Sequence, residues 1–118
     1  LVLMTKYRHQ CIDDDIFDFL KENIQRLLER AGCHLIEMNG ESDHVHILFS
    51  ASPKVQPSKV INTLKATTSR LVRNNFGEKL KPFYWKPIFW NRTYCLISTG
   101  GVSLDVVKEY IKNQDGYD

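Results

Sequence analysis

Cysteine is scarce in this sequence and is not arranged for a cross-link or a thiolate metal site. Cys11, Cys33 and Cys95 are the only cysteines among 118 residues, and no two of them form a Cys-x-x-Cys pair. An odd number of widely separated cysteines argues against a disulfide framework and against a thiolate zinc site. The chemistry of this chain must therefore be sought in other side chains.

Long apolar runs, internal repeats and low-complexity stretches are also missing. No window reaches the roughly 18 consecutive apolar residues that span a bilayer, and no signal-type segment is present. We therefore expect a cytoplasmic protein with no membrane partner. The length of 118 residues and the apolar fraction of 42% predict one globular domain, residues 1–118, with a core of its own.

Charge is distributed unevenly along the chain. Residues 51–92 carry nine Lys or Arg and one Asp or Glu, a net charge of +8, whereas the whole chain has only +2. Residues 1–50 carry five basic and nine acidic residues, and residues 93–118 carry two and four. Polyanion binding depends on the local field, so nucleic acid is a candidate partner. A solvated basic surface would explain the same pattern equally well.

The spacing of apolar residues predicts the element order β, α, β, β, α, β, α. The predicted segments are a strand at 1–8, a helix within 13–32, strands at 33–39 and 44–50, a helix at 57–75, a strand at 93–99 and a helix at 104–114. Residues 77–92 contain two prolines and are predicted to be irregular. This order predicts an α+β fold of the ferredoxin-like βαββαβ type, an antiparallel sheet with helices packed on it, plus a C-terminal helix.

Two histidines flank one valine at the start of the strand predicted for residues 44–50. Side chains alternate between the faces of a strand, so His44 and His46 share one face and Val45 lies on the other. Their Cα atoms would be about 6.5 to 7 Å apart, which allows both imidazoles to reach one metal ion. Two ordinary strand histidines would show the same pattern, and the spacing alone does not separate the two interpretations.

The predicted C-terminal helix carries two residues suited to the same chemistry. Tyr110 and Gln114 are four residues apart, so their side chains lie on one helical face. A tyrosine there could be a nucleophile, and a glutamine amide oxygen is a suitable donor to Mg²⁺ or Mn²⁺. Taken separately, each has a simpler explanation, Tyr110 as a core or interface aromatic and Gln114 as a surface polar residue.

Together, these parts resemble the single-tyrosine HUH transposases of small bacterial and archaeal insertion sequences, a superfamily that includes TnpA-like and REP-associated tyrosine transposases. HUH denotes histidine, a hydrophobic residue and histidine. The matching segments are TKYR at 5–8, DHVH at 43–46, PSKVINTLKATTSR at 57–70, Trp85 followed by FWNRTY at 89–94, and VKEYIKNQ at 107–114. The specific part is DHVH combined with the last segment. The sequence reads WNRTY where the family often has W-S-R-G-Y, which leaves the role of Asn91 and Thr93 open.

The resemblance implies a DNA transposase that cleaves and rejoins single-stranded DNA at hairpin-marked ends through a 5′-phosphotyrosine. It implies that Tyr110 is the nucleophile and that His44, His46 and Gln114 bind a divalent metal, Mg²⁺ or Mn²⁺. It also implies a prokaryotic source, a homodimer and no nucleotide cofactor.

The basic middle of the chain is the expected DNA surface. Phosphate contacts are predicted for Lys59, Lys65, Arg70, Arg73, Lys86 and Arg92. The run from Thr67 to Ser69 would allow close approach of a phosphate backbone, and Trp85, Phe89 and Trp90 suit either base stacking or burial. Alternatives are an HUH nickase serving replication or plasmid transfer, a domesticated transposase with a cellular role, or a ferredoxin-like domain that only binds single-stranded nucleic acid.

Overall fold

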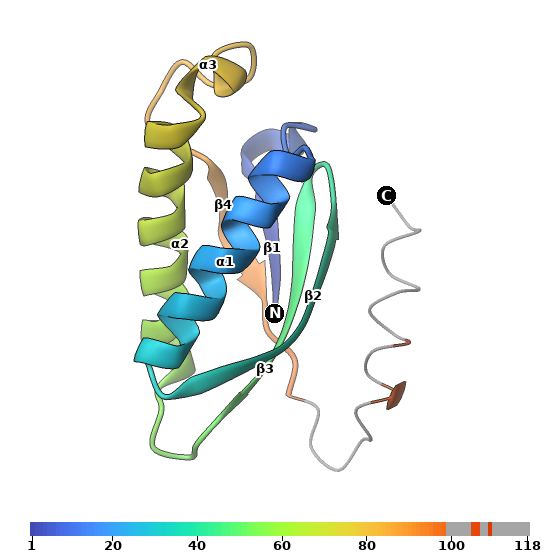
Figure 1. The fold of residues 1–118 in the computed structure, drawn as a ribbon, viewed down its shortest axis with the longest axis vertical. Helices are drawn as coiled ribbons and strands as arrows, with labels where there is room; N and C mark the ends of the chain where they lie inside the picture. Colours follow the sequence, from blue (N-terminus) through green and yellow to red (C-terminus); the bar gives the residue numbers. More distant parts are fainter. Residues whose placement is uncertain (99–104, 107–108, 110–118) are drawn as a thin grey trace.

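Four antiparallel strands form the sheet on which the rest of the fold is built (Figure 1). They are β1 (Val2–Thr5), β2 (Cys33–Glu41), β3 (His44–Ala51) and β4 (Trp90–Cys95), and they lie in the order β2-β3-β1-β4. The computed structural model describes residues 1–98, 105, 106 and 109. The predicted α+β fold and its βαββαβ order are therefore confirmed, whereas the C-terminal helix predicted at 104–114 lies largely outside the described residues.

Two long helices, α1 (Asp14–Arg30) and α2 (Pro57–Asn75), pack against one face of the sheet. Helix α1 begins where the Asp13 side chain accepts a hydrogen bond from the amide of Ile16 at 2.9 Å. It ends at Arg30 and is followed closely by Gly32, which has a φ of 79° that a residue with a side chain rarely adopts. In the part of the chain that the structure describes, no helix combines the length and the apolar character needed to cross a membrane.

Several predicted boundaries are wrong by a few residues. Strand β1 stops at Thr5, and the short 3₁₀ segment η1 (Lys6–Arg8) replaces the rest of the strand predicted at 1–8. The hairpin between β2 and β3 leaves only two residues between the strands, because β2 continues to Glu41. Strand β4 begins earlier and ends earlier than the predicted 93–99. The region predicted to be irregular contains the short helix α3 (Gly77–Leu80) and the start of β4.

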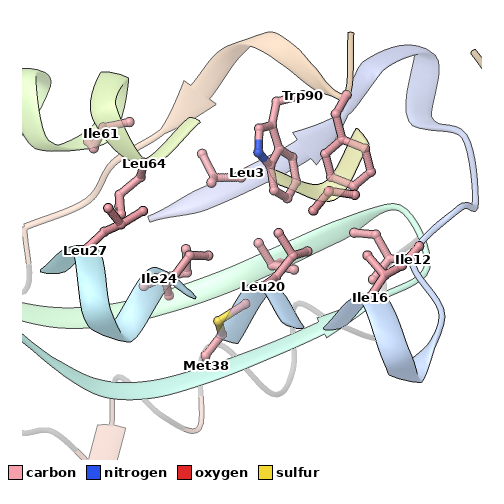
Figure 2. Packing of buried hydrophobic residues seen from close by; sticks show 14 of the residues in the cluster. Leu3, Ile12, Ile16, Leu20, Ile24, Leu27, Met38, Ile61, Leu64 and Trp90 are labelled. Carbon is pink, nitrogen blue, oxygen red and sulfur yellow. The ribbon is translucent and has the colours of Figure 1, made fainter. Parts of the chain in front are cut away.

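The core lies between the sheet and the two long helices (Figure 2). Leu3, Val45 and Ile47 face the helices from β1 and β3, and all three are buried. They meet a stripe of buried residues on each helix: Ile16, Leu20, Ile24, Leu27 and Leu28 on α1, and Val60, Ile61, Leu64, Thr68 and Val72 on α2. Burial of this apolar surface is the main contribution that holds the sheet against the helices, and it leaves the other sheet face outside this core.

Thr68 is part of this core, so the prediction of close approach to a phosphate backbone is wrong at this one position of the run from Thr67 to Ser69. Its side chain is fully buried, and its hydroxyl donates to the Leu64 carbonyl oxygen at 2.6 Å. The same hydroxyl accepts a hydrogen bond from the indole Nε1 of Trp90 at 2.9 Å. Thr68 thereby connects α2 to the first residue of β4.

We expect Thr68→Val to destabilise the protein by about 1–3 kcal/mol, because the valine has nearly the same shape but leaves the buried indole donor without an acceptor. The measurement is urea unfolding followed by circular dichroism. Thr67→Val, on the half-buried neighbouring position, is the matched control and should change stability by no more than about 0.5 kcal/mol. Equal losses for the two variants would show that the Trp90 hydrogen bond contributes nothing specific.

Candidate active site

His44 and His46 lie together on the face of the sheet that points away from the helices. Val45 and Ile47, which alternate with them on β3, point into the core. The two imidazole rings have their centroids 4.9 Å apart and meet at 87°. Both residues are buried, with 2% and 5% of their surface exposed, so they are not the half-exposed strand histidines of the simpler interpretation. The predicted pair is thus brought together on one face.

Strand pairing places further residues on this face. On β1, Met4 is paired with His44 and Val2 with His46. On β2, Asn39 is paired with His46. Directly paired residues on antiparallel strands share a face, so these side chains surround the two imidazoles. Gly40 allows the hairpin to close tightly here, because a Cβ on it would lie 2.7 Å from the His44 carbonyl oxygen. A larger residue at position 40 would displace the backbone that carries His44.

Asp43 holds the imidazole of His44 from one side. Its Oδ1 lies 2.7 Å from Nδ1 of His44. Its other oxygen, Oδ2, accepts from Nε of Arg8 at 3.0 Å and lies 3.0 Å from a terminal guanidinium nitrogen of the same arginine. Burial alone would raise the pKa of Asp43, but the hydrogen bonds from His44 and Arg8 outweigh it and leave the pKa below its ordinary value. The Asp43 carboxylate already accepts from Arg8, and at this distance it favours a hydrogen on Nδ1 of His44.

Arg8 reaches Asp43 from a strained turn. Tyr7 and Arg8 have φ angles of 61° and 55°, the left-handed region that residues with side chains seldom occupy. Two such residues in succession cost on the order of 1–3 kcal/mol each. The guanidinium also lies 3.9 Å from the sulfur of Met4, on the same sheet face as His44. The sequence segment TKYR resembled the family, but its spacing gave no indication that Arg8 contacts the histidine region.

His44 and His46 could supply two of the nitrogen donors that a divalent metal needs. A histidine whose Nδ1 donates to a carboxylate can bind a metal through Nε2, which is the common arrangement of metal-bound imidazoles in proteins. Within residues 1–98, 105, 106 and 109, no three His, Cys, Asp or Glu side chains come together in a way that could hold a metal ion. The predicted third ligand Gln114 and the predicted nucleophile Tyr110 both lie outside the described residues. His44 and His46 are thus the part of the predicted site that the structure describes.

The residues predicted to contact DNA lie in different parts of the structure. Lys59 and Arg70 line a groove of about 590 Å³ between α1 and α2, together with Arg26 and Arg30 of α1. No Asp or Glu is among the residues that line it, so its charge is wholly positive. Arg26 and Arg30 could not be predicted from the sequence, because they belong to its acidic first half. The tertiary structure brings them beside the basic helix α2.

The other predicted cations lie outside this groove. Lys65 donates from Nζ to the Arg92 carbonyl oxygen at 2.7 Å, beside β4. Burial and the nearby Lys6 lower the pKa of Lys65 below its ordinary value. Arg73 donates to the Ser69 hydroxyl at 3.3 Å on α2.

The aromatic residues between α3 and β4 differ sharply in exposure. Phe89 and Trp90 are buried, with 1% and 7% of their surface exposed, and their rings pack edge to face at 4.7 Å. Trp85 is 87% exposed, and the Lys86 ammonium lies 4.6 Å from its ring centroid. Of the three predicted base-stacking candidates, only Trp85 is accessible to a nucleobase; Phe89 and Trp90 belong to the core.

Comparison with known proteins adds independent information. The family model described as "Transposase IS200 like" matches residues 1–114. The chain is 29% identical over 114 residues to the ISDra2 transposase TnpA of Deinococcus radiodurans, covering 97% of this chain and 81% of that protein. It is also 29% identical to the transposase for insertion sequence element IS200 of Salmonella typhimurium, over 97% of this chain and 74% of the relative.

A solved structure supports the same assignment at the level of the fold. A crystal structure of a protein from Deinococcus radiodurans, described as a transposase, superposes with a TM-score of 0.75 at 28% sequence identity. The superposition covers 96% of this chain and 86% of the other. With the family match extending over nearly the whole sequence, the chain belongs to the family of IS200-like transposases.

Proposed function

We propose that this protein is a metal-dependent DNA strand transferase that cleaves and rejoins single-stranded DNA at hairpin-marked ends through a 5′-phosphotyrosine. The observation that carries the proposal is the buried pair His44 and His46, whose rings meet on the sheet face opposite the helices. Asp43 fixes the orientation of the first ring. Family membership makes DNA transposition the activity in which this site would act.

In the proposed reaction, the phenolic oxygen of Tyr110 attacks the phosphorus of a DNA phosphodiester. The new bond joins Tyr110 to the 5′-phosphate as the bond to the 3′-oxygen breaks; the phenol loses its proton, and the departing oxygen gains one to become a 3′-hydroxyl. A divalent metal bound by His44, His46 and Gln114 would neutralise charge that develops on a non-bridging phosphate oxygen. Attack by a second 3′-hydroxyl on the phosphotyrosine reverses the step and joins the strands without a nucleotide cofactor.

The groove between α1 and α2 is the proposed contact for the DNA backbone. Its four cations, Arg26, Arg30, Lys59 and Arg70, face a channel without acidic residues, which favours phosphate. This groove is on the helical layer, whereas His44 and His46 are on the opposite face of the sheet. DNA that contacts both must therefore pass around an edge of the sheet. A homodimer, which family resemblance implies, would offer a second copy of each surface.

The test of the proposed function is the formation of a covalent protein–DNA adduct. The protein is incubated with labelled single-stranded hairpin DNA from its own element ends in the presence of Mn²⁺, and the products are separated on a denaturing gel. We expect a labelled band at the mass of protein plus DNA, which disappears when the metal is chelated with EDTA. The proposal fails if folded protein on this DNA gives no adduct, and a domain that only binds nucleic acid would then be the better interpretation.

The groove makes a separate prediction about binding. We expect the double variant Arg26→Gln, Arg30→Gln to weaken hairpin-DNA binding and to reduce the slope of log affinity against log salt by about 1–2, because each lost phosphate contact removes about one released counterion. Fluorescence anisotropy over a salt series measures both quantities. Lys21→Gln is the control, since Lys21 is an exposed cation of α1 that does not line the groove. Equal effects of Lys21→Gln would mean that net charge, and not the groove, governs binding.

A further inference from the structure

We propose that Arg8 is a positioning residue for the metal site and that it acts through Asp43, which orients the imidazole of His44. The inference rests on the proposed function, because it concerns the same two histidines. It extends that function to the N-terminal turn, to which neither the family match nor the catalytic motifs assign a role. The geometry that carries it is a continuous chain of contacts from the strained turn to the histidine ring.

The first step in this chain is the orientation of the His44 ring. An imidazole on a strand can rotate about its last side-chain bond and can carry its hydrogen on either nitrogen when neutral. The contact of 2.7 Å between Asp43 Oδ1 and His44 Nδ1 restricts both freedoms, because a carboxylate that already accepts from the Arg8 guanidinium favours a hydrogen on Nδ1. With the hydrogen on Nδ1, the ring can bind a metal through Nε2.

The second step is the position of the Asp43 carboxylate. Asp43 lies in the two-residue connection between β2 and β3, where its side chain would otherwise be able to turn toward solvent. Arg8 prevents this by contacting Oδ2 with two guanidinium nitrogens, each at 3.0 Å. Because both nitrogens contact the same oxygen, the arginine fixes the position of Oδ2, and the contact of Oδ1 with His44 completes the orientation of the carboxylate.

The third step is the turn that delivers Arg8. The backbone that leads into this turn is hydrogen-bonded to two other segments. The Thr5 amide donates to the Asp43 carbonyl oxygen at 2.9 Å, and the Lys6 amide donates to the Phe89 carbonyl oxygen at 2.8 Å. The Tyr84 hydroxyl also donates to the Lys6 carbonyl oxygen at 2.7 Å. These contacts maintain the left-handed angles of Tyr7 and Arg8, an arrangement often found where a fold holds a functional side chain in place.

One consequence can be tested in the metal-free parent protein without any substitution. At a pH where the His44 ring is neutral, ¹⁵N NMR of histidine-labelled protein should show the hydrogen on Nδ1 and not on Nε2. Neutral histidines without such a contact mostly carry the hydrogen on Nε2, so the exposed His34 serves as an internal comparison. A His44 ring with the hydrogen on Nε2 would overturn the proposal.

The role of Arg8 is tested by Mn²⁺ affinity, measured by isothermal titration calorimetry on the full chain. We expect Asp43→Asn to weaken Mn²⁺ binding by roughly 10–100-fold, the usual effect of losing a carboxylate behind a metal-bound histidine. Arg8→Gln should weaken it by less, and Arg8→Lys should recover part of the loss because it restores the charge. The double variant Arg8→Gln, Asp43→Asn should bind no more weakly than Asp43→Asn alone, because Arg8 acts through Asp43.

Lys79→Gln is the matched control for these variants. It breaks a lysine contact with Asp13 at 2.7 Å and with Asp15 at 3.1 Å, an ion pair of the same kind at the start of α1. We expect unchanged Mn²⁺ affinity for this variant. Equal losses in Lys79→Gln and Arg8→Gln, or additive losses in the double variant, would overturn the inference. A parent protein with the predicted His44 tautomer but no DNA adduct would contradict the proposed function and leave the positioning contact intact.

Discussion

Replacing Tyr110 with phenylalanine is expected to abolish the covalent protein–DNA adduct. The variant lacks only the phenolic oxygen, which is the atom that would form the bond to phosphorus, so no partial activity through the same intermediate is possible. Loss of a covalent nucleophile typically lowers the rate by on the order of 10³-fold or more, and here the adduct itself should fall below detection. The measurement is a time course with labelled hairpin DNA and Mn²⁺, read on a denaturing gel.

Tyr7→Phe is the matched control for this experiment. Tyr7 is 69% exposed and precedes Arg8, which contacts Asp43 next to His44, so it is an accessible tyrosine near the two histidines. We expect it to form the adduct at close to the parent rate. Hairpin binding by both variants, measured by anisotropy without metal, should match the parent. An undiminished adduct in Tyr110→Phe would show that another side chain is the nucleophile and would remove the basis for assigning this role to Tyr110.

Replacing His44 or His46 with alanine is expected to slow cleavage by on the order of 10³-fold while hairpin binding changes little. The reason is that each imidazole would supply one of the donor atoms for the metal, and charge stabilisation by a metal contributes several kcal/mol to such a reaction. The groove that is proposed to bind the DNA backbone lies on the opposite side of the sheet and does not involve either histidine. Cleavage is measured from shortened labelled DNA, and binding is measured by anisotropy.

The control for the histidine variants is His34→Ala, which changes an exposed histidine on β2 of the same sheet. It should retain both cleavage and Mn²⁺ binding. Because His44 and His46 are buried, thermal unfolding must be measured in parallel. If the alanine variants lose their cooperative unfolding transition, His46→Gln keeps a polar side chain of similar reach and repeats the test. Full cleavage by a folded His46→Gln or His46→Ala variant would argue that this histidine is structural.

The agreement between sequence and structure is best where the chemistry is local. The alternation of His44, Val45, His46 and Ile47 predicts which side chains share a face, and the strand has this arrangement. Asp13 at the start of α1 and Gly32 at its end are likewise confirmed, because capping depends on residues within one helical turn. Boundaries set by distant partners were predicted less well. Strand β4 begins at Trp90 because that residue pairs with Thr5, and nothing near Trp90 in the sequence specifies this.

The residues of the candidate site likewise fall into those that the sequence predicted and those that only the structure revealed. Strand alternation indicated the histidine pair, whose members are two positions apart, and the resemblance to the family rested on short motifs that can be read directly from the sequence. Arg8 is 35 residues away from Asp43 in the sequence, and Arg26 joins Lys59 and Arg70 only where α1 packs beside α2. A pattern of neighbouring residues cannot reveal contacts between residues so far apart in the sequence. The burial of one sheet face against two helices brings these charges together, which is why the positioning contact and the basic groove emerge only from the folded chain.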